Sequence, residues 1–140
     1  MSYSAAQAAR LAGCSASQLQ HWARTAVVTP SEPDGRYSFG DLVALRVVRA
    51  LLDTGAPSAR ALAAVRALRD EGDDLAAVRL VADGRQIVVC RDDGQLLDAL
   101  GSGQLALFVA VDRVAAQLEI DVRNFTRERA EFVDHLVARG

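Results

Sequence analysis

Five polar side chains lie close together near the N-terminus, and their types suit contact with a nucleic acid. Amide and guanidinium groups pair with adenine and guanine edges in a major groove, and hydroxyl and imidazole groups hold phosphate oxygens. No carboxylate precedes Glu32 in the chain, so none near these side chains repels a phosphate backbone. The alternative is the solvated face of an ordinary helix. The five residues are Ser17, Gln18, Gln20, His21 and Arg24.

The charge of the chain is segregated along its length. The net charge of −2 over 140 residues argues weakly against a nucleic-acid partner. Residues 1–70, however, carry eight arginines and five carboxylates, whereas residues 71–140 carry eight arginines and thirteen carboxylates. The first half is therefore basic and the second acidic, and it is the distribution of charge that bears on DNA binding.

Two short helices with a tight turn between them are predicted to position the polar side chains. Ser4 is a good N-cap for a helix over residues 5–11, and Gly13 suits a left-handed C-terminal position. Ser15 then caps a second helix over residues 16–25. The interval of about three residues is typical of a helix-turn-helix. In the second helix Leu19 and Trp22 turn inward, and Ser15 joins the five polar residues as an expected DNA contact.

Residues 27–37 predict a short β-hairpin, or wing. Their apolar start leads into prolines and an Asp34-Gly35 turn. Arg36, just after the turn, is placed to reach a phosphate or a minor groove. We expect Tyr37 to pack or to contact DNA. Both residues belong to the predicted DNA-binding set.

Two longer helices are predicted to follow, over residues 39–53 and 58–70. Gly55 separates them and Pro57 suits a helix start. Their apolar positions recur at helical spacing. The predicted inward residues are Leu42, Leu45, Val48, Leu52, Leu62, Val65 and Leu68.

The second half predicts a β-rich insert over residues 77–108. The apolar runs 78–81 and 86–90 flank Asp83-Gly84, a strong hairpin signal. Residues 96–100 are ambiguous between helix and strand, and residues 105–108 suit a third strand.

A long helix over residues 110–138 is predicted to end the sequence. Its apolar residues are spaced as a heptad seam that Arg129 alone interrupts. We expect the seam to pair with a second copy of the chain, and the alternative is packing onto the chain's own β segment. The apolar seam residues are Val111, Ala115, Leu118, Val122, Phe125, Phe132 and Leu136. The last five of them, from Leu118 to Leu136, form the predicted dimer contact.

No catalytic site is expected. His21 and His135 lack the Ser/His/Asp or Cys/His companions of nucleophilic catalysis. The Gly101–Gly103 stretch is followed by no Lys-Ser/Thr pair, so it is not a phosphate loop.

Neither a metal nor a cofactor is expected. The Asp73-Asp74 and Asp92-Asp93 pairs lack the spacing of a calcium loop. Cys14 and Cys90 lie in no Cys-x-x-Cys motif, which indicates two reduced thiols. With neither a long apolar stretch nor a secretory signal, we expect a cytoplasmic, nucleoid-associated protein without a membrane partner.

Four motifs in the N-terminal half are similar to those of one family of bacterial regulators. Residues 3–15 pair a Tyr and a cap residue with an Ala-containing helix and a Gly-x-Ser turn, and residues 19–24 lie where Leu-Arg-Tyr-Tyr/Trp-Glu is common. Residues 36–42 read Arg-Tyr-Ser-x-x-Asp-Leu, and residues 55–57 suit the link between helices three and four. Over residues 3–68 the chain resembles the MerR family.

The resemblance implies a homodimer whose long helices pair antiparallel, with DNA bent or untwisted at a promoter. We therefore expect a mainly α fold with small β elements: a winged helix-turn-helix in residues 1–70, then a β-hairpin insert and a long C-terminal dimerisation helix in residues 71–140. The expected function is sequence-specific binding of double-stranded DNA at an inverted repeat, as a non-enzymatic transcriptional regulator. An effector, small molecule or protein, is a further expected partner. The alternatives are a protein-interaction adaptor or an effector-binding protein with a vestigial winged helix.

Overall fold

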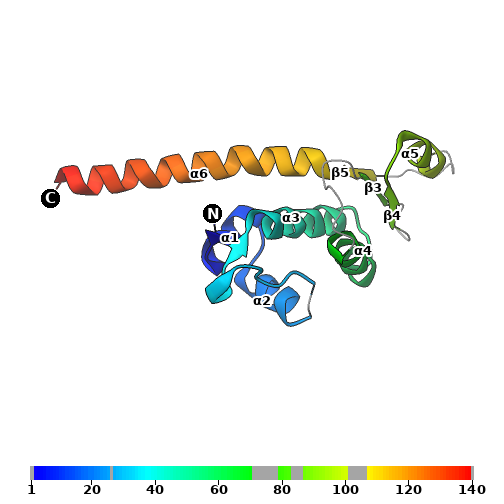
Figure 1. Ribbon diagram of the computed structural model, residues 1–140, viewed down its shortest axis with the longest axis horizontal. Helices are drawn as coiled ribbons and strands as arrows, with labels where there is room; N and C mark the ends of the chain where they lie inside the picture. The colour runs from blue at the N-terminus through cyan, green and yellow to red at the C-terminus, as the bar shows by residue number, and fades with distance from the viewer. Residues whose placement is uncertain (1, 26, 71–78, 83–86, 101–106, 140) are drawn as a thin grey trace.

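The computed structural model describes residues 2–25, 27–70, 79–82, 87–100 and 107–139. The fold is mainly helical, with a bundle of short helices, a small sheet and one long helix that runs past the bundle (Figure 1). The helices are α1 (Ala5–Ala12), α2 (Ala16–Arg24), α3 (Phe39–Asp53), α4 (Ser58–Asp70), α5 (Asp93–Leu100) and α6 (Val111–Arg139). The strands are β1 (Ser2–Tyr3), β2 (Tyr37–Ser38), β3 (Arg79–Ala82), β4 (Ile87–Cys90) and β5 (Leu107–Ala110).

The helix-turn-helix prediction is confirmed, and capping boxes fix both of its helix starts. The Ser4 hydroxyl accepts from the Gln7 amide at 3.2 Å, and the Gln7 side chain accepts from the Ser4 amide at 3.0 Å. These reciprocal bonds satisfy two amides that a helix start otherwise leaves unpaired. Gly13 ends α1 with φ +73°, a left-handed conformation that favours glycine.

α3 is the central helix of the bundle, and both of its faces are covered. The predicted stripe of Leu42, Leu45 and Val48 is fully buried, and Leu52 is half-buried. Val43, Ala44, Val47 and Leu51 are buried as well, although they were not among the predicted inward residues. A helix that is apolar nearly all round needs neighbours on more than one side. The helices α1, α4 and α6 pack against α3, and the strands β2 and β5 also contact it.

The wing is smaller than the predicted hairpin. A single antiparallel bridge joins Glu32 to Arg36 around the short 3-10 turn Pro33–Gly35. The strand that follows, β2, pairs antiparallel with β1 at the N-terminus, so that Tyr3 lies opposite Tyr37. Prolines cannot donate to a strand ladder, which accounts for the short pairing within the wing itself.

The predicted insert is a three-stranded antiparallel sheet in the order β4-β3-β5. Leu80 lies opposite both Val89 and Val109 in the register. The predicted Asp83-Gly84 turn lies outside the described residues. The ambiguous segment is helical, because α5 spans Asp93–Leu100. The Gln95 amide donates to Asp92 Oδ1 at 2.7 Å, so the Asp-Asp-Gly sequence begins this helix rather than forming a separate turn.

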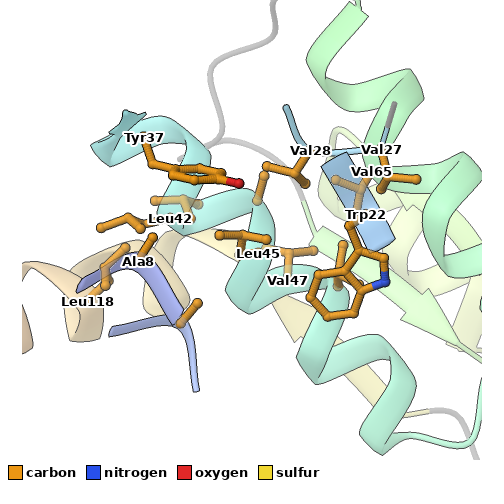
Figure 2. Close-up of a cluster of buried hydrophobic side chains, with 14 of the residues drawn as sticks. Ala8, Trp22, Val27, Val28, Tyr37, Leu42, Leu45, Val47, Val65 and Leu118 are labelled. Atoms are coloured by element: carbon orange, nitrogen blue, oxygen red, sulfur yellow. The ribbon is translucent and has the colours of Figure 1, made fainter. Parts of the chain in front are cut away.

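α6 has the predicted length, but the first part of its seam packs within the chain. Val111 and Leu118 are fully buried in the same core as α1 and α3, and Figure 2 shows Leu118 at the Ala8 end of that core. Val122 and Phe125 are half-buried against it. The first part of the seam thus has an apolar partner within the chain, and pairing of the seam with a second copy stays a prediction. The side chains of Phe132 and Leu136 lie outside the described part of the helix.

Polar contacts add to the packing of α6 on the bundle. An Arg46 guanidinium nitrogen lies 2.7 Å from Asp121 Oδ2, and the Arg10 guanidinium carbon lies 5.4 Å from the centre of the Phe125 ring. The hydrogen bond from Arg46 holds the pKa of Asp121 below its usual range. The boundary predicted at residue 70 stays a prediction, although Leu80 and Leu118 from the second half share one buried cluster with the first.

Candidate nucleic-acid interface

One face of α2 carries exposed polar side chains, while the opposite face anchors the helix. Leu19 and Trp22 are 2% and 4% exposed, and Figure 2 shows Trp22 among the buried side chains of the core. The exposed residues are Ser17, Gln18, Gln20, His21 and Arg24. Because α2 contains no carboxylate, its outer face offers hydrogen-bond donors and positive charge to an anionic partner.

Two of the predicted contact residues also hold the start of α2. The Ser15 hydroxyl accepts from the Gln18 amide at 3.1 Å, and the Ser15 amide donates to Gln18 Oε1 at 3.1 Å. The Gln18 amide group is therefore already engaged in a capping box in the unbound chain. The other predicted contact residues of α2 take no part in this capping box. They are Ser17, Gln20, His21 and Arg24.

Three arginines outside α2 hold the turn and the ends of the first two helices. Arg46 Nε donates to the Leu11 carbonyl at 2.8 Å, and Arg49 Nη1 donates to the Gly13 carbonyl. Arg66 Nη2 donates to the Thr25 carbonyl at 3.1 Å. The last carbonyls of a helix lack partners within it and carry partial negative charge, so guanidinium groups stabilise them.

None of these three arginines belongs to the predicted contact set. Arg46 and Arg49 lie one turn apart on α3, and their spacing favours a solvated helix face. Only the tertiary arrangement brings them against the end of α1. By binding these carbonyls, the arginines hold the turn and the end of α2 against α3 and α4.

A buried carboxylate ties the wing to α3 and α4. Asp41 is fully buried; its Oδ2 accepts from the Ser31 hydroxyl at 2.7 Å, from the Ser31 amide at 3.0 Å and from the Ser38 amide at 2.8 Å. Its Oδ1 lies 2.5 Å from an Arg69 nitrogen. Burial raises the pKa of Asp41, but the hydrogen bonds from Ser38, Arg69 and Ser31 outweigh it, and the net pKa lies below the usual range.

Arg36 is held by the N-terminal strand. Its Nε donates to the Ser2 hydroxyl at 2.8 Å and its Nη2 donates to the Ser2 carbonyl at 3.1 Å. These bonds fasten β1 beside β2. Arg36 is half-buried, so its first role in the unbound chain is structural.

Tyr37 lies in the core and does not reach the surface with Arg36. Its side chain is 3% exposed, and Figure 2 shows its ring above Leu42. Burial, followed by the charge of Asp41, raises the pKa of its hydroxyl. Of the two roles expected for Tyr37, the structure shows packing in the core. Tyr37 is therefore not part of the exposed face of α2.

One known protein family matches the part of the chain that carries this face. Residues 3–61 match the family described as MerR HTH family regulatory protein. Residues 3–61 form a MerR-family helix-turn-helix domain. This MerR domain contains α1, α2, the wing, α3 and the start of α4, and the match confirms the family that the sequence motifs predicted.

Relatives of the MerR domain and of the rest of the chain occur in mycobacteria. Uncharacterized HTH-type transcriptional regulators of Mycobacterium tuberculosis and Mycobacterium bovis are 33% identical over 144 residues. The alignment covers 97% of this chain and 64% of each relative, so the chain spans less than two thirds of their length.

The described side chains also bear on a metal site, a reactive thiol and a membrane span. Across the described ranges, no group of three or more His, Cys, Asp or Glu side chains is placed to hold a metal ion. Burial raises the pKa of both the Cys14 and the Cys90 thiols, which disfavours the thiolate. None of the described helices is long and apolar enough to cross a membrane.

Proposed function

We propose that this chain binds duplex DNA in a sequence-specific manner, with α2 in the major groove, and acts as a homodimeric transcriptional regulator. The observation that carries the proposal is the outer face of α2, where Ser17, Gln20, His21 and Arg24 are exposed on a rigidly anchored helix. Gln and Arg side chains are suited to adenine and guanine edges. Ser and His are suited to phosphate oxygens.

The other half of the contact face is the wing. Its Ser31 bonds to Asp41 at the start of α3, which supports a wing held against α3 before binding. We propose that Arg36 adds a phosphate contact beside its bonds to Ser2. Its bound role is then shared between the protein and the DNA.

We propose that the dimer forms through the C-terminal part of α6. With 29 residues this helix is about 43 Å long. Its last described contact with the bundle is the pair Arg10 and Glu128, at 3.9 Å. The heptad pattern continues beyond that point to Phe132 and Leu136, which are apolar residues suited to a second copy. A two-fold dimer would read an inverted repeat.

Fluorescence anisotropy with labelled duplexes from the promoter region of the protein's own gene tests the proposal. We expect saturable binding that weakens steeply with salt, since each neutralised phosphate releases counterions. A scrambled duplex of equal length should bind at least about a thousandfold more weakly at moderate salt. Equal affinity for both duplexes, or no binding at low salt, refutes the regulator and leaves the adaptor alternative.

A further inference from the structure

Two arginines of α4 contact the two parts of the proposed DNA face. Arg66 Nη2 donates at 3.1 Å to the carbonyl of Thr25, which caps the end of α2. One turn further along α4, an Arg69 nitrogen lies 2.5 Å from Oδ1 of the buried Asp41. The other oxygen of Asp41 accepts from the hydroxyl and the amide of Ser31, at the start of the wing. α4 is therefore joined to the end of α2 directly and to the wing through one carboxylate.

Another side of α4 faces the sheet of the second half. Figure 1 shows α4 between α2 and β4, and α4 packs against β4. Because residues three and four positions apart share one side of a helix, the alanines of α4 that face β4 lie together, and Arg66 and Arg69 lie on a different side. The residues that line the groove between α4 and β4 are Arg60, Ala63, Ala64, Ala67, Ile87 and Val89. α4 thus links the proposed DNA face to the sheet.

The Asp41–Arg69 pair is costly to bury. The side chain of Asp41 is 0% exposed and that of Arg69 is 29% exposed. Arg69 Nη1 is buried and has no hydrogen-bond partner among the described residues. A buried donor without an acceptor costs free energy, and apolar residues of similar volume often replace a buried ion pair without loss of stability. The location of the pair, between the end of α4 and the wing, therefore points to a role beyond stability.

We propose that α4 sets the spacing between the outer face of α2 and the wing, with Arg66 and Arg69 as positioning residues for DNA binding. This role rests on the proposed DNA-binding function. Two elements that contact one duplex bind best when their separation is fixed beforehand, because less freedom is lost on binding. A displacement of α4 then changes DNA affinity without contact between α4 and DNA. Because β4 packs against α4, the sheet can impose that displacement.

Amide hydrogen exchange tests the hold on the wing without any DNA. Ser31 is an exposed residue, but its amide donates to Asp41 and should be protected in the wild type. Arg69→Met removes the charge and the donors at nearly the same side-chain length, and it should speed exchange at Ser31 about tenfold relative to Leu45 in the core of α3. Arg69→Lys keeps a charged donor and should restore most of the protection.

Arg60→Met is the matched control for Arg69→Met. Arg60 is an exposed arginine on the sheet-facing side of the same helix, so its loss should leave exchange at Ser31 unchanged. An unprotected Ser31 amide in the wild type overturns the proposal. So does exchange at Ser31 that is the same in Arg69→Met as in Arg60→Met.

DNA affinity in the anisotropy assay tests what the hold on the wing does. Arg69→Met should weaken DNA binding about tenfold, and Arg60→Met should not change it. Weaker binding with unchanged exchange at Ser31 makes Arg69 a direct DNA contact and overturns the positioning role. Faster exchange with unchanged DNA affinity shows that the wing needs no such hold, and it overturns the role as well.

A double variant tests whether Arg69 acts through Ser31. Because both side chains bond to the same carboxylate, the losses of DNA affinity in Arg69→Met and Ser31→Ala should not multiply when the two are combined. Losses that multiply fully would mean independent effects and would contradict a path from Arg69 through Asp41 to the wing.

Arg66→Met tests the hold on α2 and decides the proposal if Arg69→Met does not fold. Arg66 and Thr25 are both exposed, so the fold should tolerate the change. The Thr25 amide, which donates to the His21 carbonyl at 3.0 Å, should exchange several-fold faster, and DNA affinity should fall several-fold. Unchanged exchange and affinity in Arg66→Met overturn the proposal. If the wild type binds no DNA, the proposed function fails, whereas the exchange results still show whether α4 holds the wing and α2.

Discussion

Arg24 and Arg36 are both basic residues of the N-terminal half, but their surroundings differ. Arg24 is exposed at the last turn of α2, whereas two nitrogens of Arg36 are bonded to Ser2. A side chain without a competing partner contributes its full charge to a phosphate or base contact. Loss of Arg24 should therefore act on binding, and loss of Arg36 should act on both binding and the strand pair.

Arg24→Ala is expected to weaken DNA binding about tenfold with unchanged stability. If the contact is to phosphate, the slope of log affinity against log salt falls by about one. If the contact is to a base, the loss is confined to one sequence position and the slope stays the same. Anisotropy titrations at several salt concentrations distinguish these results. Arg127→Ala, which removes an exposed arginine of α6, is the control and should leave affinity unchanged.

Asp41 is the residue on which the wing, α3 and α4 depend together. Asp41→Asn leaves Arg69 without its carboxylate and weakens the cap of α3, so the free energy of unfolding should fall by about 3 kcal/mol at pH 7. Urea denaturation followed by circular dichroism measures it. Ser31→Ala removes the hydroxyl that bonds to both Asp41 and Ser38 but keeps the carboxylate, and it should cost about 1 kcal/mol. Equal losses in the two variants would contradict a central role for the carboxylate.

The stability that Asp41 contributes should depend on pH. Its pKa in the folded chain lies below the unfolded value of about 3.9, so the contribution is present above that value. It is lost as the pH falls through the folded pKa. The difference in unfolding free energy between wild type and Asp41→Asn should therefore be full at pH 7 and shrink below about pH 4. A difference that stays constant down to pH 2 would contradict the lowered pKa.

At the level of elements, α6 packs against the bundle and stabilises it, and it is also the proposed dimer helix. Its early turns bury Val111 and Leu118 against α1 and α3, and the Arg46–Asp121 pair lies beside them. A helix docked in this way restricts the movement of α3, whose arginines hold the turn before α2. The position of α6 therefore affects the position of α2, whose outer face is the proposed DNA contact.

Leu118→Ala separates the two roles of α6. Because Leu118 is fully buried within one chain, the variant should lose about 2–5 kcal/mol of stability at any protein concentration. Chemical denaturation at two protein concentrations measures this. Ile120→Ala is the control: Ile120 lies two residues away, is 48% exposed and should lose less than about 1 kcal/mol. A dimer that dissociates while monomer stability is unchanged would show that Leu118 packs between chains.

At the scale of the whole molecule, the division between basic and acidic halves follows the division between structural elements. The basic half contains the helix-turn-helix, and the acidic half contains the sheet and α6. Figure 1 shows α6 extending well past the bundle toward the C-terminus. The negative charge of residues 71–140 disfavours nonspecific contact of that half with DNA. The proposed contact face of α2 lies in the basic half, which attracts phosphates.

Leu136→Asp is expected to produce monomers if the end of α6 forms the dimer. A charge at a heptad position is costly in a buried helix pair and tolerable on a solvated helix. Sedimentation velocity over a range of concentrations measures the outcome. Asn124→Asp is the matched control, since it adds the same charge to an exposed side chain of the same helix. An unchanged dimer in Leu136→Asp would place the interface elsewhere.

Local sequence signals determined the elements and the family. Ser4, Ser15 and Gly13 mark helix ends by their own hydrogen bonding and backbone freedom, so the first two helices and the turn follow from neighbouring residues. The bounds of α3 also match the prediction. The outer face of α2 was predictable because the inward Leu19 and Trp22 leave the polar residues on the other side.

The partners of those elements were decided only by the tertiary structure. A heptad pattern fixes which face of α6 is apolar but not what covers it, and the bundle of the same chain covers Leu118. Strand pairing between β1 and β2 joins residues more than thirty positions apart, which no local signal specifies. The same holds for Tyr37 in the core, for Arg36 on Ser2 and for Arg49 on Gly13. Each depends on long-range packing, where burial and hydrogen-bond geometry choose among partners that the sequence alone leaves equivalent.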